Sequence, residues 1–452
     1  PPVTPLDDAA IAKQEEDYWA ASRKEPSEAP FSALLRSGDF ATLEQKLDAV
    51  QSDYETRKVG EGWVFAVFHT FQQAKLEEDV ARWARERPRS WAALAARGIS
   101  QHARGNRARG GRTVGETAPQ QLAEMEMRLA AAERDYRSAL AQRPRLLPVY
   151  SYLIDITQKR GDPQTARAVL EEALRQDPGA FFVRDAYIGM LQPKWGGSWE
   201  AMEHFAQSAQ AHVDKNPHLV TLLGYTPAAR AYERVLRRDW PGARDLYTEA
   251  MRFGREPIWL SMRAKAYEKM NQCPAAVADL TEAIRLDPTR AEFHAERAWC
   301  RKTLGQSDAA FEDYARAAEL APDPYWMVSG YATALEHAQR PRDAVAVYEK
   351  FLATHPDHAE AFEAMGVIYK QSLHEPDRAR EVFKLVVELA PDRASAWRNY
   401  GDVLRQLHDD AAARKVYARY LELADTRDPI ERVIAPTIRS YLATPPPASI
   451  AE

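Results

Sequence analysis

Nine arginines lie between Arg82 and Arg112 of this 452-residue chain, and such side chains could bind an anion. The end of the run holds Arg104, Arg107, Arg109 and Arg112 together with three glycines, which predicts a flexible basic loop. A guanidinium group presents a planar fork of donors that matches a phosphate or a carboxylate. The segment is therefore interpreted as a solvated structural loop, as a grip on an acidic protein segment, or as a contact to a nucleic-acid backbone.

Nucleic acid is the least favoured of these three partners. The arginines are not interleaved with aromatic residues on which bases could stack. The whole chain has 61 basic and 66 acidic residues, a net charge of −5, and so no general attraction to a polyanion. Binding that weakened steeply with salt and was lost on deletion of 104–112 would indicate nucleic acid.

A second distinctive stretch contains Trp195, Gly196, Gly197 and Ser198. The two glycines permit backbone angles that other residues avoid, and Ser198 is predicted to cap a helix that starts directly after it. The stretch is interpreted either as a hairpin turn with a packed tryptophan or as part of a small-ligand site.

The remaining polar residues form no catalytic or metal-binding signature. The glycines between Gly105 and Gly115 lack the lysine and the serine or threonine of a phosphate-binding loop. His355 and His358 flank a turn that offers no further metal ligand, and glutamates such as Glu171 lie on exposed helix faces. We therefore expect no cofactor, no metal and no catalysis. The alternative is a small-ligand or enzymatic site in the N-terminal half.

These residues must be positioned by a repeating element. Prolines recur 34 or 35 residues apart, at Pro288, Pro322, Pro356 and Pro391. Alanines keep the same interval, at Ala276, Ala310, Ala344, Ala379 and Ala413. A period of this length is typical of stacked helix hairpins. Pro144 and Pro178, again 34 residues apart, extend the repeat into the N-terminal half.

The order of residues within one period gives a physical reason for each position. In 257–290 it is Leu260, Ala264, Tyr267, Ala276, Leu280, Ala283 and Pro288. Small residues fit where the two helices of a hairpin cross, and the proline ends the second helix. This order resembles the tetratricopeptide repeat. The resemblance implies an all-α fold, a right-handed superhelical solenoid of antiparallel helix hairpins in which only stacking completes the core.

The resemblance covers most of the chain. Repeat units are expected at 147–180, 181–217, 224–256, 257–290, 291–324, 325–358, 359–393 and 394–427. A further unit starts at Trp91 and resumes at Ala132, with an insertion of roughly two dozen residues between its halves. The apolar spacing in 429–442 predicts a capping helix over the last open face.

Residues 31–255 also resemble a bacterial domain family of unknown function that is found joined to tetratricopeptide repeats. Its most specific element is the run from Pro193 to Ser198. The resemblance implies kinship and a helical architecture, and it brings no activity. The expected domains are 1–86, divergent helical hairpins; 87–256, a helical domain with a basic insertion near 104–120; 257–427, regular repeats; and 428–452, a capping helix and a proline-rich tail.

The resemblance to tetratricopeptide repeats implies a concave groove, faced by the second, fifth, ninth and twelfth residues of each unit. The groove residues are predicted to be Ser261, Lys265, Trp299, Lys302, Trp326, Ser329, Arg398 and Arg405. The clamp that some family members use for a terminal carboxylate is absent, because Ser261 and Lys265 occupy its positions. We therefore expect a non-enzymatic scaffold that binds an acidic or aromatic peptide or protein segment, with Trp299 and Trp326 as anchors or as core residues.

Three properties stay open at this level. Cys273 and Cys300 fall in adjacent repeats and are interpreted as isolated small residues or as a bridged pair. No run of about 18 apolar residues occurs that would predict a membrane span. The chain starts with Pro1, so a cleaved secretory signal is one explanation and a bacterial protein, exported or cytoplasmic, is expected. The oligomeric state is not predicted.

Overall fold

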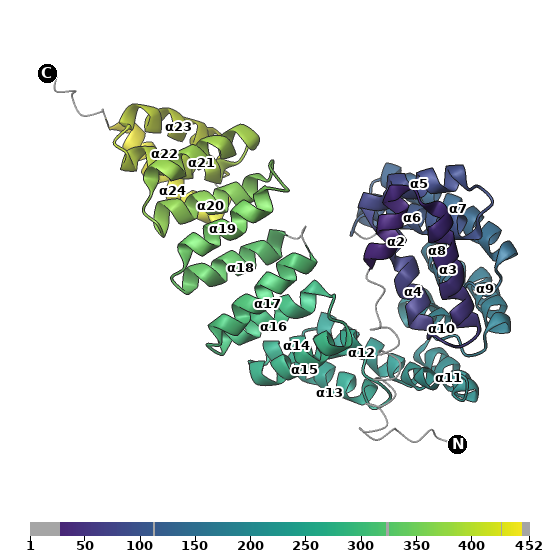
Figure 1. The fold of residues 1–452 in the computed structure, drawn as a ribbon. Helices are drawn as coiled ribbons and strands as arrows, with labels where there is room; N and C mark the ends of the chain where they lie inside the picture. Colours follow the sequence, from purple (N-terminus) through teal and green to yellow (C-terminus); the bar gives the residue numbers. More distant parts are fainter. Residues whose placement is uncertain (1–27, 112–113, 322–324, 426, 445–452) are drawn as a thin grey trace. The chain divides into compact units, whose positions relative to one another are not determined.

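The structure is a computed structural model that describes residues 28–444 except 112–113, 322–324 and 426. Within these residues the secondary structure is helical, with no β-strand, as an all-α repeat fold requires (Figure 1). The chain forms two compact units, residues 1–266 and 267–452, which we describe separately. None of the described helices is both long and apolar enough to cross a membrane.

The first unit consists of helices connected by short turns and 3-10 segments. Its α-helices are α2 (Glu28–Ser37), α3 (Phe40–Glu55), α4 (Glu61–His69), α5 (Glu77–Glu86), α6 (Trp91–Arg109), α7 (Pro119–Gln142), α8 (Leu147–Arg160), α9 (Pro163–Gln176), α10 (Phe182–Ile188), α11 (Trp199–Ala209), α12 (Tyr225–Leu236) and α13 (Trp240–Ala250). Helix α14 (Pro257–Lys269) spans the boundary between the units. Three of the 3-10 segments between these helices are η1 (Thr70–Gln72), η2 (Ala74–Leu76) and η7 (Pro217–Gly224).

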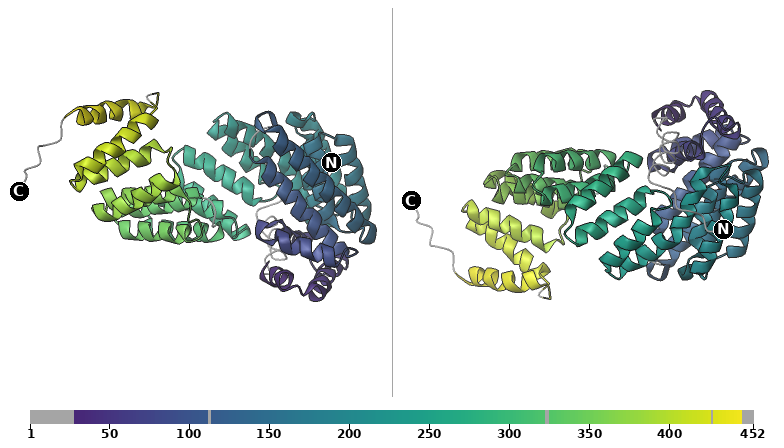
Figure 2. Two further views of the ribbon diagram at one scale, coloured as in Figure 1. Left: turned by 90° about the horizontal axis from the view of Figure 1, so that it is seen from above. Right: turned by 90° about the horizontal axis from the view of Figure 1, so that it is seen from below.

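The second unit is a stack of antiparallel helix hairpins closed by one further helix (Figure 2). Its helices are α15 (Cys273–Leu286), α16 (Ala291–Thr303), α17 (Ser307–Leu320), α18 (Tyr325–His337), α19 (Pro341–Leu352), α20 (Ala359–Gln371), α21 (Pro376–Leu389), α22 (Ala394–Gln406), α23 (Asp410–Leu423) and α24 (Pro429–Ala443). Because every helix packs on its sequence neighbours, this unit is a solenoid.

The same turn closes successive hairpins. One residue in each turn adopts a left-handed backbone conformation, which ends the first helix and reverses the chain. These residues are Asn271, Gly305, Gln339, His374 and His408, with φ between 55° and 75°. Four of these five residues are not glycine, although glycine adopts this conformation most easily. The end of the helix therefore imposes the left-handed conformation on other residue types as well.

Close approach between the two helices of a hairpin depends on small residues. A Cβ atom added at Gly401 of α22 would lie 2.5 Å from the ring of Tyr417 on α23, and one added at Gly366 would lie 2.9 Å from Phe383. These rings fill the space that the glycines leave and are buried. Small residues thus lie where the two helices of a hairpin cross, as the repeat pattern predicts.

The α6–α7 hairpin of the first unit repeats this packing despite its insertion. A Cβ at Gly98 would lie 2.5 Å from the ring of Tyr136. Directly before that tyrosine, Asp135 accepts two hydrogen bonds from Arg97, at 2.8 and 2.6 Å. The pair Arg297 and Asp313 has the same distances between α16 and α17. Helices α6 and α7 are thus the two halves of one repeat hairpin.

Helix α24 covers the end of the second unit, as the apolar spacing predicts. Ala435 and Ile438 are buried against α23, where they pack with Tyr417 and Tyr420. The side chain of Asp428 caps the first turn by accepting hydrogen bonds from the backbone N–H of Ile430 and Glu431. Residues Ile430 and Val433 of the same helix remain exposed.

Candidate functional site

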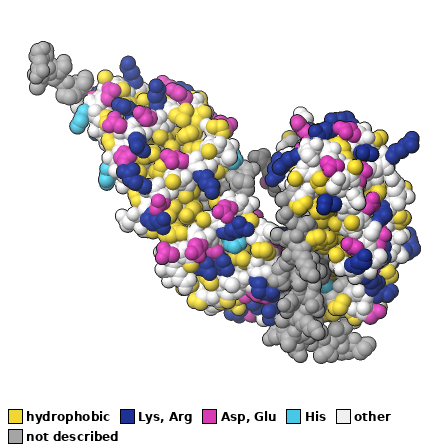
Figure 3. Space-filling model, viewed as in Figure 1, with side chains coloured by type: hydrophobic (Ala, Val, Ile, Leu, Met, Phe, Trp, Pro, Cys, Tyr) yellow, Lys and Arg dark blue, Asp and Glu magenta, His cyan; other side chains and the backbone are white. Residues whose placement is uncertain are grey.

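The first helices of successive hairpins in the second unit lie beside one another, since α18 contacts α20 and α20 contacts α22. We call the surface formed by their second, fifth, ninth and twelfth residues the repeat face. Its polar and aromatic members are Glu292, Trp299 and Lys302 on α16; Trp326, Ser329, Thr333 and Glu336 on α18; Glu360, Glu363 and Lys370 on α20; and Ser395, Arg398, Asp402 and Arg405 on α22. Hydrophobic and charged side chains are interspersed over the side of this unit seen in Figure 3.

Trp299 and Trp326 are exposed, at 45% and 56% of their full surface. A tryptophan buries a large apolar area when a partner covers it, so two exposed indoles in consecutive hairpins can act as anchors. The Lys302 side chain forms no ion pair or hydrogen bond with a described residue. Ser329 is engaged within the unit, because its hydroxyl hydrogen-bonds Tyr325 and Tyr348.

The charged residues on α20 and α22 are mostly paired with one another. Lys370 donates to Asn399 at 2.7 Å and to Asp402 at 3.2 Å. Arg393 bridges Glu360 and Glu363, at 2.6 and 2.8 Å. We call these contacts between successive hairpins the polar ladder, together with the Ser372–Glu336 hydrogen bond at 2.7 Å. Since Lys370 is buried, its partners compensate the loss of its hydration.

The last two predicted groove residues contact the capping helix. Arg398 lies 3.4 Å from the Glu431 carboxylate of α24. The guanidinium group of Arg405 lies over the ring of Tyr441, 4.6 Å from its centre. A partner on this part of the repeat face would therefore meet side chains that already pack against α24. Their role in binding stays a prediction.

The first two predicted groove residues lie on α14 in the first unit. Ser261 is buried and Lys265 is half-buried. The structure thus distributes the eight predicted residues over both units and groups Trp299, Lys302, Trp326 and Ser329 on α16 and α18. The sequence pattern alone does not distinguish the residues on α14 from those on α16 and α18, because it predicts the same four groove positions in every repeat.

The predicted basic loop is wrong for residues 104–109, which form the last turns of α6. Gly105 is buried there, and a Cβ added to it would lie 3.2 Å from the Cβ of Arg128 on α7. This glycine therefore permits close helix packing, whereas the sequence suggested flexibility. Arg107 donates to the Gln72 backbone oxygen at 3.1 Å and pairs with Glu77.

The other arginines of this segment differ in their surroundings. Arg104 lies 3.7 Å from the same Glu77 carboxylate that Arg107 contacts. Arg109 is half-buried at the end of α6, and Arg112 lies outside the described residues. Because two of the four guanidinium groups are paired within the first unit, the segment offers less free positive charge than its sequence suggests.

The turn before α11 has the predicted local geometry. Ser198 accepts a hydrogen bond from the Ala201 backbone N–H at 3.1 Å, so its role as helix cap is confirmed. Gly196 has a φ of 88°, and a Cβ at Gly197 would lie 2.1 Å from the Leu191 oxygen. Trp195 is 54% exposed, which is not the packed tryptophan expected of a simple hairpin turn.

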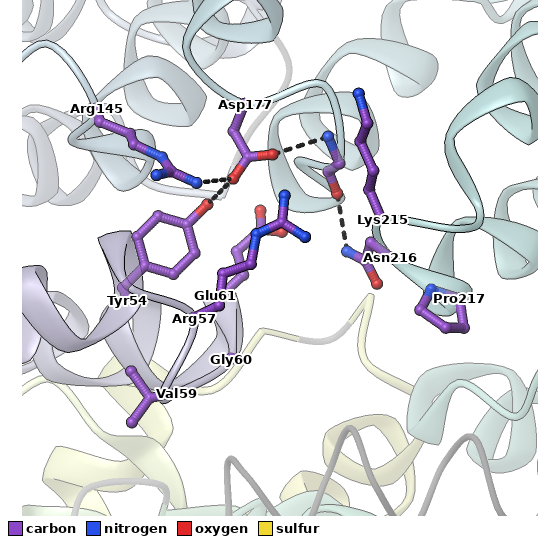
Figure 4. Close-up of a pocket in the computed structure, with 11 residues that line it drawn as sticks. Tyr54, Arg57, Val59, Gly60, Glu61, Arg145, Asp177, Lys215, Asn216 and Pro217 are labelled. Atoms are coloured by element: carbon purple, nitrogen blue, oxygen red, sulfur yellow. Dashed lines mark hydrogen bonds and ion pairs between the residues drawn. The ribbon is translucent and has the colours of Figure 1, made fainter.

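Two polar cavities in the first unit were not predicted from any sequence motif. The smaller, of about 180 Å³, is built around Asp177, which follows α9 (Figure 4). One Asp177 oxygen accepts from the Tyr54 hydroxyl at 2.7 Å and from Arg145 at 2.8 Å, and the other accepts from the Gly179 N–H at 2.8 Å. These contacts lower the pKa of Asp177 although its partial burial opposes this. They join the ends of α3, α7 and α9.

Glu61 lies beside Asp177 in this cavity and is buried (Figure 4). Its two oxygens accept from the backbone N–H groups of Phe181 and Phe182, both at 2.8 Å, at the start of α10. Burial raises the pKa of Glu61 to about 8, against the lowering effect of these hydrogen bonds. With each acceptor of Asp177 and Glu61 occupied, this cavity is a structural junction between distant helices.

The larger cavity, of about 350 Å³, lies among α4, α6, α8 and α10. His102 Nε2 lies 2.5 Å from Asp155 Oδ2, and Lys159 pairs with the same carboxylate. Hydrogen bonding and charge from His102 and Lys159 outweigh burial and lower the pKa of Asp155 to about 2. Asp185, on the α10 side, has its pKa raised by burial to about 6. Two carboxyl groups with opposite shifts therefore line one cavity.

Comparison with known families agrees with this architecture. The tetratricopeptide repeat family matches residues 261–324 and 368–428. The family described as "Domain of unknown function (DUF4034)" matches residues 137–218, a segment that runs from the end of α7 to the start of η7. The chain thus carries tetratricopeptide repeats in its C-terminal part and a DUF4034 domain in its N-terminal half. Both expected resemblances are confirmed, whereas a bacterial origin is not tested.

Curated relatives share only a short stretch with this chain. Serine/threonine-protein phosphatase T of Aspergillus oryzae is 33% identical over 88 residues, which are 19% of this chain and 18% of that protein. The protein of the same name from Trypanosoma brucei brucei is 32% identical over 85 residues, with the same two shares. The chain therefore spans less than a fifth of the length of these relatives.

Solved structures of helical repeats are similar at low identity. The C-terminal part of a TPR repeat-containing protein from Cytophaga hutchinsonii is 18% identical, with a TM-score of 0.40, over 47% of this chain and 86% of that one. YrrB, a TPR protein described as having an unusual peptide-binding site, is 17% identical, with a TM-score of 0.33, over 42% and 97%. Likeness at this level concerns the helical repeat alone.

Proposed function

We propose that the chain is a non-enzymatic protein-interaction scaffold that holds an extended segment of a partner protein on the repeat face. The tetratricopeptide repeats of the C-terminal part support an interaction role. The observation that carries the proposal is the exposure of Trp299 and Trp326, 45% and 56%, on the first helices of two consecutive hairpins. Large aromatic side chains in such a position lose contact with water only when a partner covers them.

The surroundings of the two tryptophans favour an acidic or aromatic segment. Lys302 lies one helical turn after Trp299 on α16 and has no acidic partner among the described residues. Most charges of α20 and α22 on this face are engaged, either in the polar ladder or against α24, so they add little free charge. A partner carboxylate near Lys302 and an apolar side chain against each indole would satisfy both features.

The proposal is tested by replacing the anchors. The full chain, the double variant Trp299→Ala with Trp326→Ala, and the control Trp195→Ala are immobilised and exposed to a lysate of the source cell. Captured proteins are quantified by mass spectrometry, and the strongest candidate is then measured by calorimetry. We expect the double variant to lose at least about tenfold in affinity, whereas Trp195→Ala retains it.

The control is matched because Trp195 is equally exposed, at 54%, but lies on a turn of the first unit. Equal capture by the double variant and the full chain, with loss on Trp195→Ala, would overturn the proposal. It would then place the partner on the first unit. Circular dichroism of each variant shows whether the helices are retained.

A further inference from the structure

The cavity around His102 and Asp155 has the composition of a cation site. Among the described residues that line it, two are aspartates, Asp155 and Asp185, and none is lysine or arginine. Asp155 uses only its Oδ2 atom to pair with His102 and Lys159. Its Oδ1 atom has no hydrogen-bond donor among the described residues, and its side chain is 35% exposed. One acceptor of a carboxylate that lines the cavity therefore stays open.

Further acceptors lie on other helices around the same space. Gln72 donates its amide nitrogen to the Tyr152 hydroxyl at 2.6 Å, and its side-chain oxygen has no described donor. Asp185 lines the cavity from α10 and accepts a hydrogen bond from the Tyr225 hydroxyl, with Glu256 and His218 nearby. The Ser151 hydroxyl and His102 Nδ1, which also line this space, have no partner among the described residues. The two carboxyl groups favour a ligand that brings a cationic N–H donor.

The walls of the cavity are aromatic. The rings of Phe65 on α4 and Phe182 on α10 have their centres 4.4 Å apart. The ring of Tyr152 lies 5.4 Å from that of His102. Aromatic faces attract cations and provide apolar surface for an organic body. A site of about 350 Å³ is within the usual range for small molecules.

We propose that this cavity binds a small organic cation, a primary amine with an aromatic or apolar body. Its ammonium group donates to Asp155 and Asp185, and its body lies against Phe65, Tyr152 and Phe182. Lys159 and His102 hold Asp155 in place and keep it ionised. The proposal goes beyond partner binding on the repeat face, because every residue that it uses lies in the first unit.

Three probes that share one aromatic ring but differ in charge show whether binding depends on the charge of the ligand or on its shape. Benzylamine is cationic, benzyl alcohol is neutral and benzoate is anionic at pH 7. Calorimetry of the full chain should detect benzylamine binding, with benzyl alcohol at least about tenfold weaker and benzoate weaker still. Binding of benzoate as tight as that of benzylamine would overturn the proposal. Absence of benzylamine binding up to about 10 mM would do the same.

Variants then locate the bound amine. Asp155→Asn and Asp185→Asn should each weaken benzylamine binding by about tenfold or more, since each removes one charge partner. Glu86→Gln, an exposed carboxylate at the end of α5, serves as the matched control and should leave the affinity unchanged. If both aspartate variants keep their helical spectrum and bind benzylamine as the full chain does, the site is elsewhere and the proposal fails.

Discussion

Glu61 is a carboxyl group whose chemistry is set by its neighbours. It is buried, and both of its oxygens are occupied by the N–H groups that begin α10. These hydrogen bonds stabilise the ionised form, but the loss of hydration is the larger effect and raises the pKa to about 8. Such a group joins α4 to α10 and also makes the stability of the fold depend on pH.

The first unit should lose stability as the pH rises. The ordinary pKa of Glu61 is 4.5 and its pKa in the folded chain is about 8, so the folded state binds this proton more tightly. Its contribution is therefore complete below about pH 4.5 and is lost as the pH rises through 8. We expect the loss, on the order of a few kcal/mol, to be absent in Glu61→Gln, which does not titrate.

Urea unfolding of both proteins at pH 5, 7 and 9 measures this dependence. Glu61→Gln should be less stable than the natural chain at pH 5. Its NH2 group would face a backbone N–H, whereas the hydroxyl oxygen of the protonated carboxyl can still accept a hydrogen bond. The two proteins should approach one another at pH 9. Parallel curves over the whole range would show that Glu61 does not titrate between these values.

Contacts between residues that are close in the sequence could be predicted, whereas contacts between distant residues could not. Ser198 caps a helix that starts at the next residue, so its role follows from local sequence. Glu61 meets Phe181 across 120 residues, and His102 meets Asp155 across 53. Such contacts depend on how helices stack, and no spacing rule in the sequence brings them together. For this reason the cavities around Asp177 and Asp155 were missed.

The hairpins depend on pairs formed by a small residue and an aromatic ring. Gly401 faces Tyr417, Gly366 faces Phe383, and Gly98 faces Tyr136 across the long α6–α7 hairpin. In each pair the ring occupies the space of the missing side chain, so the helix axes can approach. Gly330 on α18 differs, because a Cβ there would lie 3.7 Å from Tyr314, an ordinary contact.

Adding one methyl group should therefore have opposite effects at two helical glycines. Gly401→Ala is expected to destabilise the second unit by about 1–3 kcal/mol, because its Cβ would overlap the ring of Tyr417. Gly330→Ala should be neutral or stabilise it by up to about 1 kcal/mol, because alanine favours a helix. Thermal and urea unfolding of the full chain measure both. A loss of stability in Gly330→Ala equal to that in Gly401→Ala would contradict this packing.

The two cysteines lie close enough to react with each other. Both are buried as free thiols, and their sulfur atoms are 2.8 Å apart at the contact of α15 with α16. Hydrogen peroxide can accept the two electrons and two protons and leave a disulfide and water. We expect peroxide to join Cys273 and Cys300 and to raise the stability of this unit by about 3 kcal/mol.

Peptide mapping shows this bond as the loss of two hydrogens from the linked peptides, reversed by dithiothreitol. Cys300→Ser cannot form it and should show no rise in thermal stability after peroxide treatment. If both thiols of the natural chain can still be alkylated in denaturant after oxidation, the two cysteines do not form a bridge. The interpretation as isolated small residues would then hold.

At the level of elements, the repeat period predicted the hairpins of the second unit well. Alternating small and large residues and recurring prolines describe local packing that every repeat shares. The end of α6 was predicted less well, because Gly105 suggested a flexible loop. Glycine is unfavourable in an isolated helix, but here it lets α7 pack closely against α6, at a distance of 3.2 Å to Arg128. Tertiary contact overrides the local preference at this position.

The whole molecule consists of two units, and each has its own buried core. In a stack of hairpins most contacts join neighbours, so a local defect should spread only to the nearest helices. We therefore expect Gly401→Ala to accelerate amide hydrogen exchange in α22, α23 and α24, with α6, α7 and α8 unchanged. Gly98→Ala should have the converse effect. Accelerated exchange of both units in either variant would show that the chain unfolds as one cooperative body.

The polar ladder of the second unit also has a mechanical consequence. Its contacts join α20 to α22 and α18 to α20, and each link spans the interface between successive hairpins. A force that pulled the two ends of this stack apart would load such interfaces in series, because each interface must carry the whole tension. The weakest would yield first and the others would follow one by one. The unit should therefore extend in steps of one hairpin and recoil when the tension is released.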